Sequence, residues 1–187
     1  NGRVNIVGRL NGKVSIIAGG GLSIARAIAI AFAKEGSKVV IAAQHEREGE
    51  KIVQMITEQG GEATFIKTDL TNSLDVENMI QATVDFYGKL SVIVNNGSDD
   101  QLEPPEICNL SEEVWDRIID TNLKRVYLCC KYGLRVMKKA KEGVIVNISS
   151  IEGLIKSNQP AFSASQGGII QLTKGIAATM GKYNIRA

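Results

Sequence analysis

Short apolar runs alternate with longer amphipathic segments along the whole chain. The first unit shows the pattern: an apolar run at 14–17 precedes three glycines, an amphipathic segment at 24–36 and a second apolar run at 38–42. A continuous apolar run is typical of a buried strand, whereas apolar residues at helical spacing form a helix that a glycine can end. The sequence therefore predicts a strand, a glycine turn, a helix and a second strand.

The same alternation continues to the end of the chain. Further strands are predicted at 63–67, 90–94 and 143–148, and further helices at 46–59, 73–87, 111–139 and 162–181. Ser111 is expected to cap its helix after a proline-containing loop at 98–110. Because parallel strands are joined by right-handed crossovers, this alternation predicts an α/β fold, a doubly wound parallel sheet with helices on both faces. Such sheets bind ligands at the carboxyl ends of their strands.

The composition excludes several classes of function. The 187 residues are 44% hydrophobic, and 22 basic against 20 acidic residues give a net charge of +2. Without a basic cluster to neutralise phosphates, nucleic acid is not expected as a partner. No apolar stretch reaches the roughly 20 residues of a membrane span and no signal-peptide pattern opens the chain, so a cytoplasmic protein without a membrane partner is expected. With His45 as the single histidine and no CxxC pair, no metal site is expected.

Residues 18–25, Ala-Gly-Gly-Gly-Leu-Ser-Ile-Ala, separate the first strand from the first helix. A glycine turn in this context presents amides at a helix N-terminus and permits close approach of a phosphate, although a tight strand-to-helix turn explains the glycines as well. Ser23 and Ala25 stand where a dinucleotide fingerprint has two further glycines, and each adds a Cβ. The turn therefore predicts a phosphate-binding loop of altered sequence.

Five motifs, in this order along the chain, resemble those of the short-chain dehydrogenase/reductase family. The first is the turn that begins at Gly19, which is similar to the family's Gly-x-x-x-Gly-Ile-Gly. The others are Asp69-Leu70, Asn95-Asn96-Gly97-Ser98, Asp120-Thr121-Asn122-Leu123 and Asn147-Ile148-Ser149-Ser150. The resemblance covers the chain from Leu10 onward and implies a Rossmann-type three-layer α/β/α fold.

The resemblance also implies that a nicotinamide dinucleotide, NAD or NADP, binds at the strand ends. The residues assigned to the cofactor are Gly19, Gly21, Ser23, Ile24, Gln44, Asp69, Leu70, Asn95, Asn96 and Gly97. NAD usually meets a carboxylate at the end of the second strand, whereas this chain has Ala43-Gln44-His45 with Arg47 beyond. The sequence therefore slightly favours NADP, although Arg47 also fits a solvated helix start.

The family's reaction is hydride transfer between the nicotinamide and a carbonyl or alcohol, with a tyrosine that gives or takes the proton. A lysine four residues later shares the helix face and lowers the tyrosine pKa from about 10. The matching positions here hold Phe162 and Gln166, so both groups are absent. Ser150 and Asn122 remain at the family's serine and asparagine positions, although a strand-end cap and a bond to the helix backbone explain them equally well.

The residues support more than one functional hypothesis. The first is an oxidoreductase that binds NADP or NAD and transfers hydride weakly or not at all, because the proton donor is lost. The second is a non-catalytic dinucleotide sensor or a structural partner within an oligomer, and a third is chemistry on an activated carbonyl by Ser150 alone. The resemblance implies a homodimer or homotetramer through the helix after Ser111 and the last helix, although burial against the sheet also explains their apolar residues.

The resemblance implies that the chain is shorter than the complete domain of the family. Residues 1–187 are expected to form a single dinucleotide-binding domain that is incomplete at the C-terminus. The chain stops at 183–187, where the family's sixth strand would begin. We therefore expect the last two strands and the substrate loop to be missing, and an edge of the sheet to be left unpaired.

Overall fold

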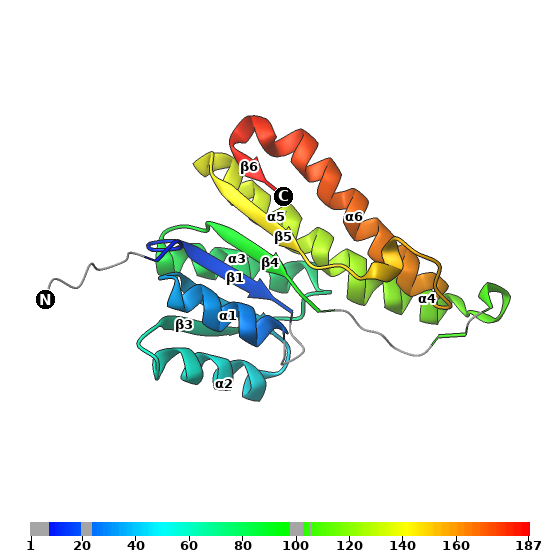
Figure 1. Cartoon of the computed structure of the whole chain (residues 1–187), viewed down its shortest axis with the longest axis horizontal. Coiled ribbons are helices and arrows are strands. Elements are labelled where there is room, and N and C mark those ends of the chain that lie inside the picture. The colour runs from blue at the N-terminus through cyan, green and yellow to red at the C-terminus, as the bar shows by residue number, and fades with distance from the viewer. Residues whose placement is uncertain (1–7, 20–23, 98–102, 105) are drawn as a thin grey trace, which may run out of the picture.

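The computed structural model describes residues 8–19, 24–97, 103–104 and 106–187. These residues form a six-stranded parallel sheet in the order β3-β2-β1-β4-β5-β6 (Figure 1). The strands are β1 (Val14–Ala18), β2 (Lys38–Ala43), β3 (Glu62–Lys67), β4 (Val92–Asn95), β5 (Gly143–Asn147) and β6 (Ile185–Arg186). The strand order reverses between β1 and β4, and this switch point is where sheets of this class bind ligands.

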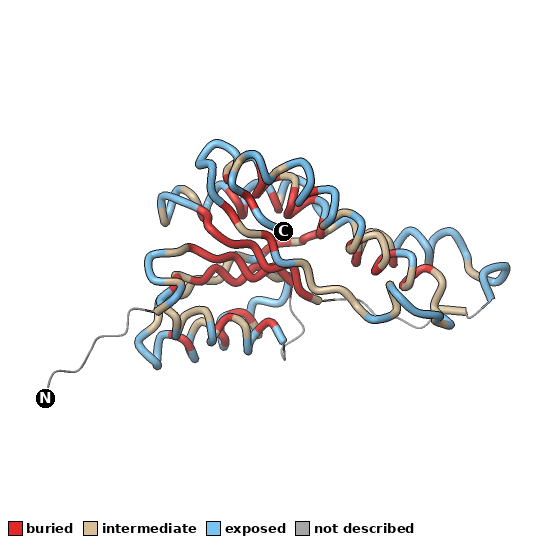
Figure 2. The backbone as a smooth tube through the Cα atoms, turned by 45° about the horizontal axis from the view of Figure 1, so that its top comes forward, coloured by how far each residue is buried: buried red, intermediate tan, exposed pale blue. Residues whose placement is uncertain are grey.

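Helices cover both faces of the sheet. They are α1 (Ile24–Lys34), α2 (Glu46–Thr57), α3 (Ser73–Tyr87), α4 (Glu112–Ile119), α5 (Arg125–Ala140) and α6 (Pro160–Met180). Ile17 of β1 packs in a buried cluster with α1 and α2, whereas its neighbour Ile16 packs with α3, α5 and α6. The buried positions concentrate in the strands between these layers (Figure 2). The structure confirms the doubly wound three-layer fold.

The long helix expected over 111–139 is divided in the structure. α4 and α5 are joined by a π-helical turn, η2 (Asp120–Lys124). Ser111 caps α4 as predicted, because its hydroxyl accepts from the N–H of Val114 at 3.4 Å. A π-helical turn is rare and occurs as a single turn inside an α-helix, so the apolar pattern predicted one continuous helix.

The C-terminal residues correct the expectation that the sheet ends at its fifth strand. Ile185 and Arg186 form β6 and pair with Gly143 and Val144 of β5. Ile185 is 2% exposed and belongs to the core. The first of the two strands expected to be missing is therefore present as a short strand, and it covers the amino-terminal half of β5.

Short 3₁₀ turns complete the described chain. They are η1 (Ile107–Asn109), η3 (Ile151–Gly153) and η4 (Gly181–Tyr183). Across the described ranges, no helix combines the length and the apolar character needed to cross a membrane.

Candidate functional site

The glycine turn begins at the carboxyl end of β1, beside the end of β4. Gly19 has a φ of +79°, a conformation that favours glycine, and its N–H donates to the Ala42 carbonyl oxygen at 2.9 Å. A Cβ on Gly19 would lie 2.2 Å from the Asn96 carbonyl oxygen, so no side chain fits. Ile24 opens α1 and is 53% exposed. Gly21 and Ser23 lie outside the described residues.

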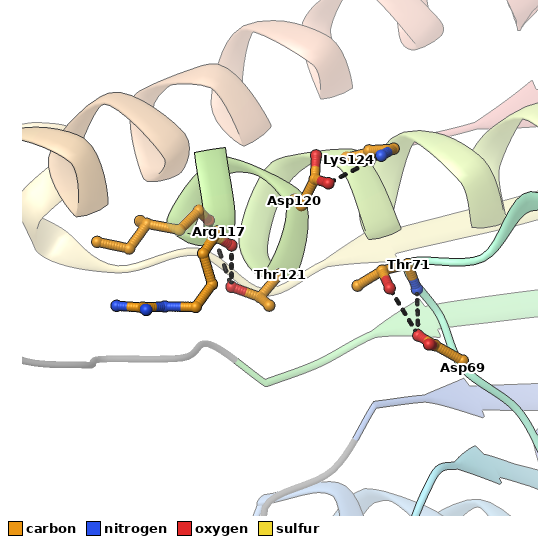
Figure 3. A network of polar contacts seen from close by, with 7 residues as sticks. Asp69, Thr71, Arg117, Asp120, Thr121 and Lys124 are labelled. Carbon is orange, nitrogen blue, oxygen red and sulfur yellow. Dashed lines mark hydrogen bonds and ion pairs between the residues drawn. The ribbon is translucent and has the colours of Figure 1, made fainter. Parts of the chain in front are cut away.

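A polar cluster follows the neighbouring strands β2 and β3. The Asp69 carboxylate accepts from the N–H and the hydroxyl of Thr71 at 2.9 and 2.7 Å (Figure 3). Partial burial raises the pKa of Asp69, but hydrogen bonds from Thr71 and Gln44 outweigh burial and hold that pKa below its usual value. Leu70 is buried in the core, so Gln44 and Asp69 are the polar groups that this cluster presents.

Asn95 and Asn96 at the end of β4 have different structural roles. The Asn95 side chain is buried and its Nδ2 donates to Asn147 Oδ1 at 2.8 Å, while Asn147 Nδ2 donates to Thr173 Oγ1 at 2.8 Å. This chain of bonds ties β4, β5 and α6 together. The N–H of Asn96 donates to the Ala18 carbonyl oxygen, and Gly97 turns the chain away with a φ of +100°. Asn95 thus stabilises the strand ends, whereas Asn96 and Gly97 shape the backbone that follows β4 at the carboxyl end of the sheet.

Asn122 lies in the π-helical turn between α4 and α5. Its side chain is fully buried, and its Nδ2 donates to the Ile118 carbonyl oxygen at 3.0 Å. The same turn carries a hydrogen bond from Thr121 to the Arg117 carbonyl oxygen and an ion pair between Lys124 and Asp120 (Figure 3). The backbone bond predicted for Asn122 is therefore present, in a helix segment that departs from α-geometry.

Gln166 is the partner of Ser150. The N–H of Ser150 donates to Gln166 Oε1 at 2.9 Å, and Gln166 Nε2 donates to Ser165 Oγ at 3.4 Å. The Ser150 hydroxyl accepts from the N–H of Glu152 at 3.4 Å and so caps η3, whereas the structural interpretation of this serine expected a cap at the end of the strand. Gln166 is 1% exposed. The amide at the position of the family's lysine therefore holds the segment after β5 against α6.

Phe162 is buried near the start of α6 and packs against Ile118 and Ala161. The Glu103 carboxylate accepts from the N–H groups of Ala161 and Phe162 at 3.0 and 2.9 Å. Sequence reasoning missed Glu103, because 58 residues separate it from the helix that it caps. The sequence shows a helix that begins with Pro160 and acidic residues upstream of it, but it does not show which acidic residue caps the helix.

The predicted site residues fall into two groups. Ser150 and Gln166 are in contact. Ile118 joins Asn122 to Phe162, because its carbonyl oxygen accepts from the Asn122 side chain and its own side chain packs against Phe162. Gln44 and Asp69 form a separate cluster beyond β1 in the sheet. The first group lies around the segment after β5 and the start of α6, on the other side of β1 from Gln44 and Asp69.

The cysteines near these strands are not nucleophiles. Burial raises the pKa of Cys129 and of Cys130 to about 12, so both are thiols near neutral pH. Cys108 is exposed. Within the described ranges, no group of three or more His, Cys, Asp or Glu residues is placed to hold a metal ion.

Comparison with known proteins decides the family. The family profile described as short chain dehydrogenase matches residues 13–187. The chain belongs to the short-chain dehydrogenase family. An uncharacterised oxidoreductase of Thermotoga maritima is 39% identical over 178 residues, 95% of this chain and 69% of the relative. The cyclopentanol dehydrogenase of Comamonas testosteroni is 33% identical over 181 residues, 96% of this chain and 72% of the relative.

Solved structures of short-chain dehydrogenases share the fold. NAD+-bound xylitol dehydrogenase superposes with a TM-score of 0.90 at 29% identity, over 96% of this chain and 69% of that one. A short chain dehydrogenase from Mycobacterium smegmatis gives 0.88 at 29% identity, over 96% and 75%. The chain thus spans about seven tenths of the length of these relatives, and it has the fold of a family that binds NAD(P).

Two observations test whether these residues fit a dinucleotide. Gly19 has no room for a Cβ on the side of Asn96 and adopts a glycine conformation at the switch point, as a phosphate-binding turn requires. Asp69, with its lowered pKa, offers a hydrogen-bond acceptor beside Gln44 at the distal end. The described part of the site therefore fits the cofactor of the family.

Proposed function

We propose that this short-chain dehydrogenase binds a nicotinamide dinucleotide and has lost most of the hydride-transfer activity of its family. The observation that supports the proposal is the burial and bonding of the side chains at positions 162 and 166. Phe162 is 4% exposed and packed among apolar side chains, and Gln166 is 1% exposed and hydrogen-bonded at both ends of its amide. A phenyl ring and an amide have no proton to exchange with a substrate near neutral pH.

A nicotinamide, when bound, supplies the hydride or accepts it. Ser150, at the family's serine position, carries a hydroxyl that can donate to the oxygen of a carbonyl substrate. The proton needed to complete reduction to an alcohol has no donor at position 162. Loss of general acid–base catalysis typically lowers a rate by about 10²–10⁴. We therefore expect weak turnover of carbonyl or alcohol substrates.

We further propose a preference for NADP. The end of β2 presents Gln44, an exposed amide, where a carboxylate would repel a 2′-phosphate. Titration of the protein's effect on nicotinamide fluorescence, with NADPH and NADH in parallel, tests both ideas. Tighter binding of NADPH is expected. Equal affinities would refute the preference, and no binding of either form would refute the proposed function.

A second candidate function is that of a dinucleotide sensor without catalysis. The observation that favours it is the use of the catalytic positions for structure: Gln166 holds Ser150, and Glu103 caps the helix at Phe162. The same titration followed by a turnover assay separates the two functions. Binding with measurable reduction of ketones supports a weakened enzyme, whereas binding without any turnover supports the sensor.

We also propose that two copies of the chain associate through α5 and α6. A groove of about 380 Å³ between these helices is lined by apolar side chains, among them Leu134, Leu172 and Ile176, and by the basic side chains of Lys131, Arg135 and Lys138. The long helix is acidic in its α4 half and basic in its α5 half, with Glu112 and Lys138 as examples. Antiparallel packing of two such helices brings opposite charges together.

A further inference from the structure

Arg125, the first residue of α5, reaches the end of the sheet where β1 and β4 meet. Its Nη1 donates to the Asn96 carbonyl oxygen at 3.2 Å. The same nitrogen fills the space beside Gly19, because a Cβ on that glycine would lie 2.5 Å from it. The guanidinium therefore contacts both strand ends that form the switch point of the sheet.

This position places a positive charge next to the start of the glycine turn. The N–H of Gly19 already donates to the Ala42 carbonyl oxygen, so it is not available to an anion. What this part of the site offers to an anion is the positive charge of Arg125. Arg125 is half-buried and its Nε is shielded from solvent, so water screens its charge less than that of an exposed side chain. A guanidinium remains charged at every pH that a protein tolerates.

We propose that Arg125 is a positioning residue of the dinucleotide site. Its hydrogen bond fixes the carbonyl of Asn96 against Gly19, and its charge attracts the diphosphate of the cofactor to the turn. The proposal rests on the proposed function, because it assumes that the site takes a dinucleotide. It extends that function by naming a source of phosphate affinity on α5, outside the glycine turn itself.

The experiment measures the Kd of NADPH and NADH at increasing salt for the wild type, Arg125→Met, Arg125→Gln and Arg125→Lys. Arg125→Met is expected to bind about tenfold more weakly at low salt and to approach the wild type as salt screens the charge. Arg125→Gln keeps a donor for Asn96 but loses the charge, so it should lose the salt-dependent part of the affinity and bind between Arg125→Met and the wild type at low salt. Arg125→Lys should retain the salt dependence.

Lys139→Met removes the same charge from an exposed position on α5 and serves as the control; its Kd should not change. Circular dichroism identifies any variant that fails to fold, and Arg125→Lys against Arg125→Gln then carries the comparison. Wild-type affinity in Arg125→Met, or a loss that is the same at every salt concentration, would overturn the inference alone. No dinucleotide binding by the wild type would overturn both this inference and the proposed function.

Discussion

The Gln166 side chain joins the segment after β5 to α6 through hydrogen bonds at both ends of its amide. Gln166 accepts from Ser150 through Oε1 and donates to Ser165 through Nε2. The hydroxyl proton of Ser165 is already used, because it donates to the Phe162 carbonyl oxygen at 2.6 Å. Position 166 therefore needs an acceptor and a donor in one side chain. An amide supplies both, whereas an ammonium supplies only donors.

Gln166→Leu is therefore expected to lower the free energy of unfolding by about 1–3 kcal/mol, because a buried N–H and a buried hydroxyl each lose a partner. Gln166→Glu still accepts from Ser150 but buries a carboxylate that has no donor for Ser165, so at neutral pH it should lose at least as much stability. Urea unfolding followed by circular dichroism measures the difference. Gln171→Leu, an exposed position on the same helix, is the matched control. Equal stability of Gln166→Leu and the wild type would contradict the structural role of the amide.

The assignment of positions 162 and 166 to the family's tyrosine and lysine is a prediction from the sequence, because the motif fixes both positions relative to Ser150. The new role of Gln166 could not be predicted. It depends on how closely η3 approaches α6, where a Cβ on Gly153 would lie 2.8 Å from the backbone of Gln166. Such a distance follows from tertiary packing and leaves no local trace in the sequence.

At the scale of elements, α6 depends on a residue from a distant loop. The helix opens with Pro160, which has no N–H, so Ala161 and Phe162 carry the first N–H groups that need partners. The Glu103 carboxylate accepts from both, and its negative charge lies at the positive end of the helix dipole. This contact links the loop after β4 to the helix that holds Phe162 and Gln166.

Glu103→Ala is expected to destabilise the protein by about 1–2 kcal/mol through loss of this cap. Glu103→Gln, which keeps an acceptor but no charge, should fall between the variant and the wild type. Thermal and urea unfolding provide the measurement, with Glu106→Ala in the same loop as the control. The cap would be contradicted if Glu103→Ala and Glu106→Ala changed stability equally.

The strands and helices themselves could be predicted because each follows from a local pattern of apolar residues. The π-helical turn at Asp120–Lys124 could not be predicted, because a single π turn inside an α-helix is too short and too rare to have a recognisable sequence pattern. β6 was missed for another reason: its two residues are too few to form a pattern, and their pairing with β5 is set by the return of α6.

At the scale of the whole molecule, the proposed association of two copies depends on the surface formed by α5 and α6. Tyr127 lies on α5, lines the groove and is 45% exposed. Tyr127→Asp places a charge in the proposed contact between copies, so the variant should be monomeric by light scattering at concentrations where the wild type is a dimer or tetramer. Phe86→Asp, at an exposed aromatic of α3, should leave the mass unchanged. A monomeric wild type would contradict the proposed interface.

We have proposed that this short-chain dehydrogenase binds a nicotinamide dinucleotide but lacks the proton donor of its family. The most direct measurement is the steady-state turnover of a panel of ketones at saturating NADPH or NADH, for the wild type and for Phe162→Tyr combined with Gln166→Lys. We predict wild-type turnover near background and an increase of about 10²-fold or more in the double variant, at some loss of stability. Turnover by the wild type at rates ordinary for enzymes, about 1 s⁻¹ or faster, would contradict the account.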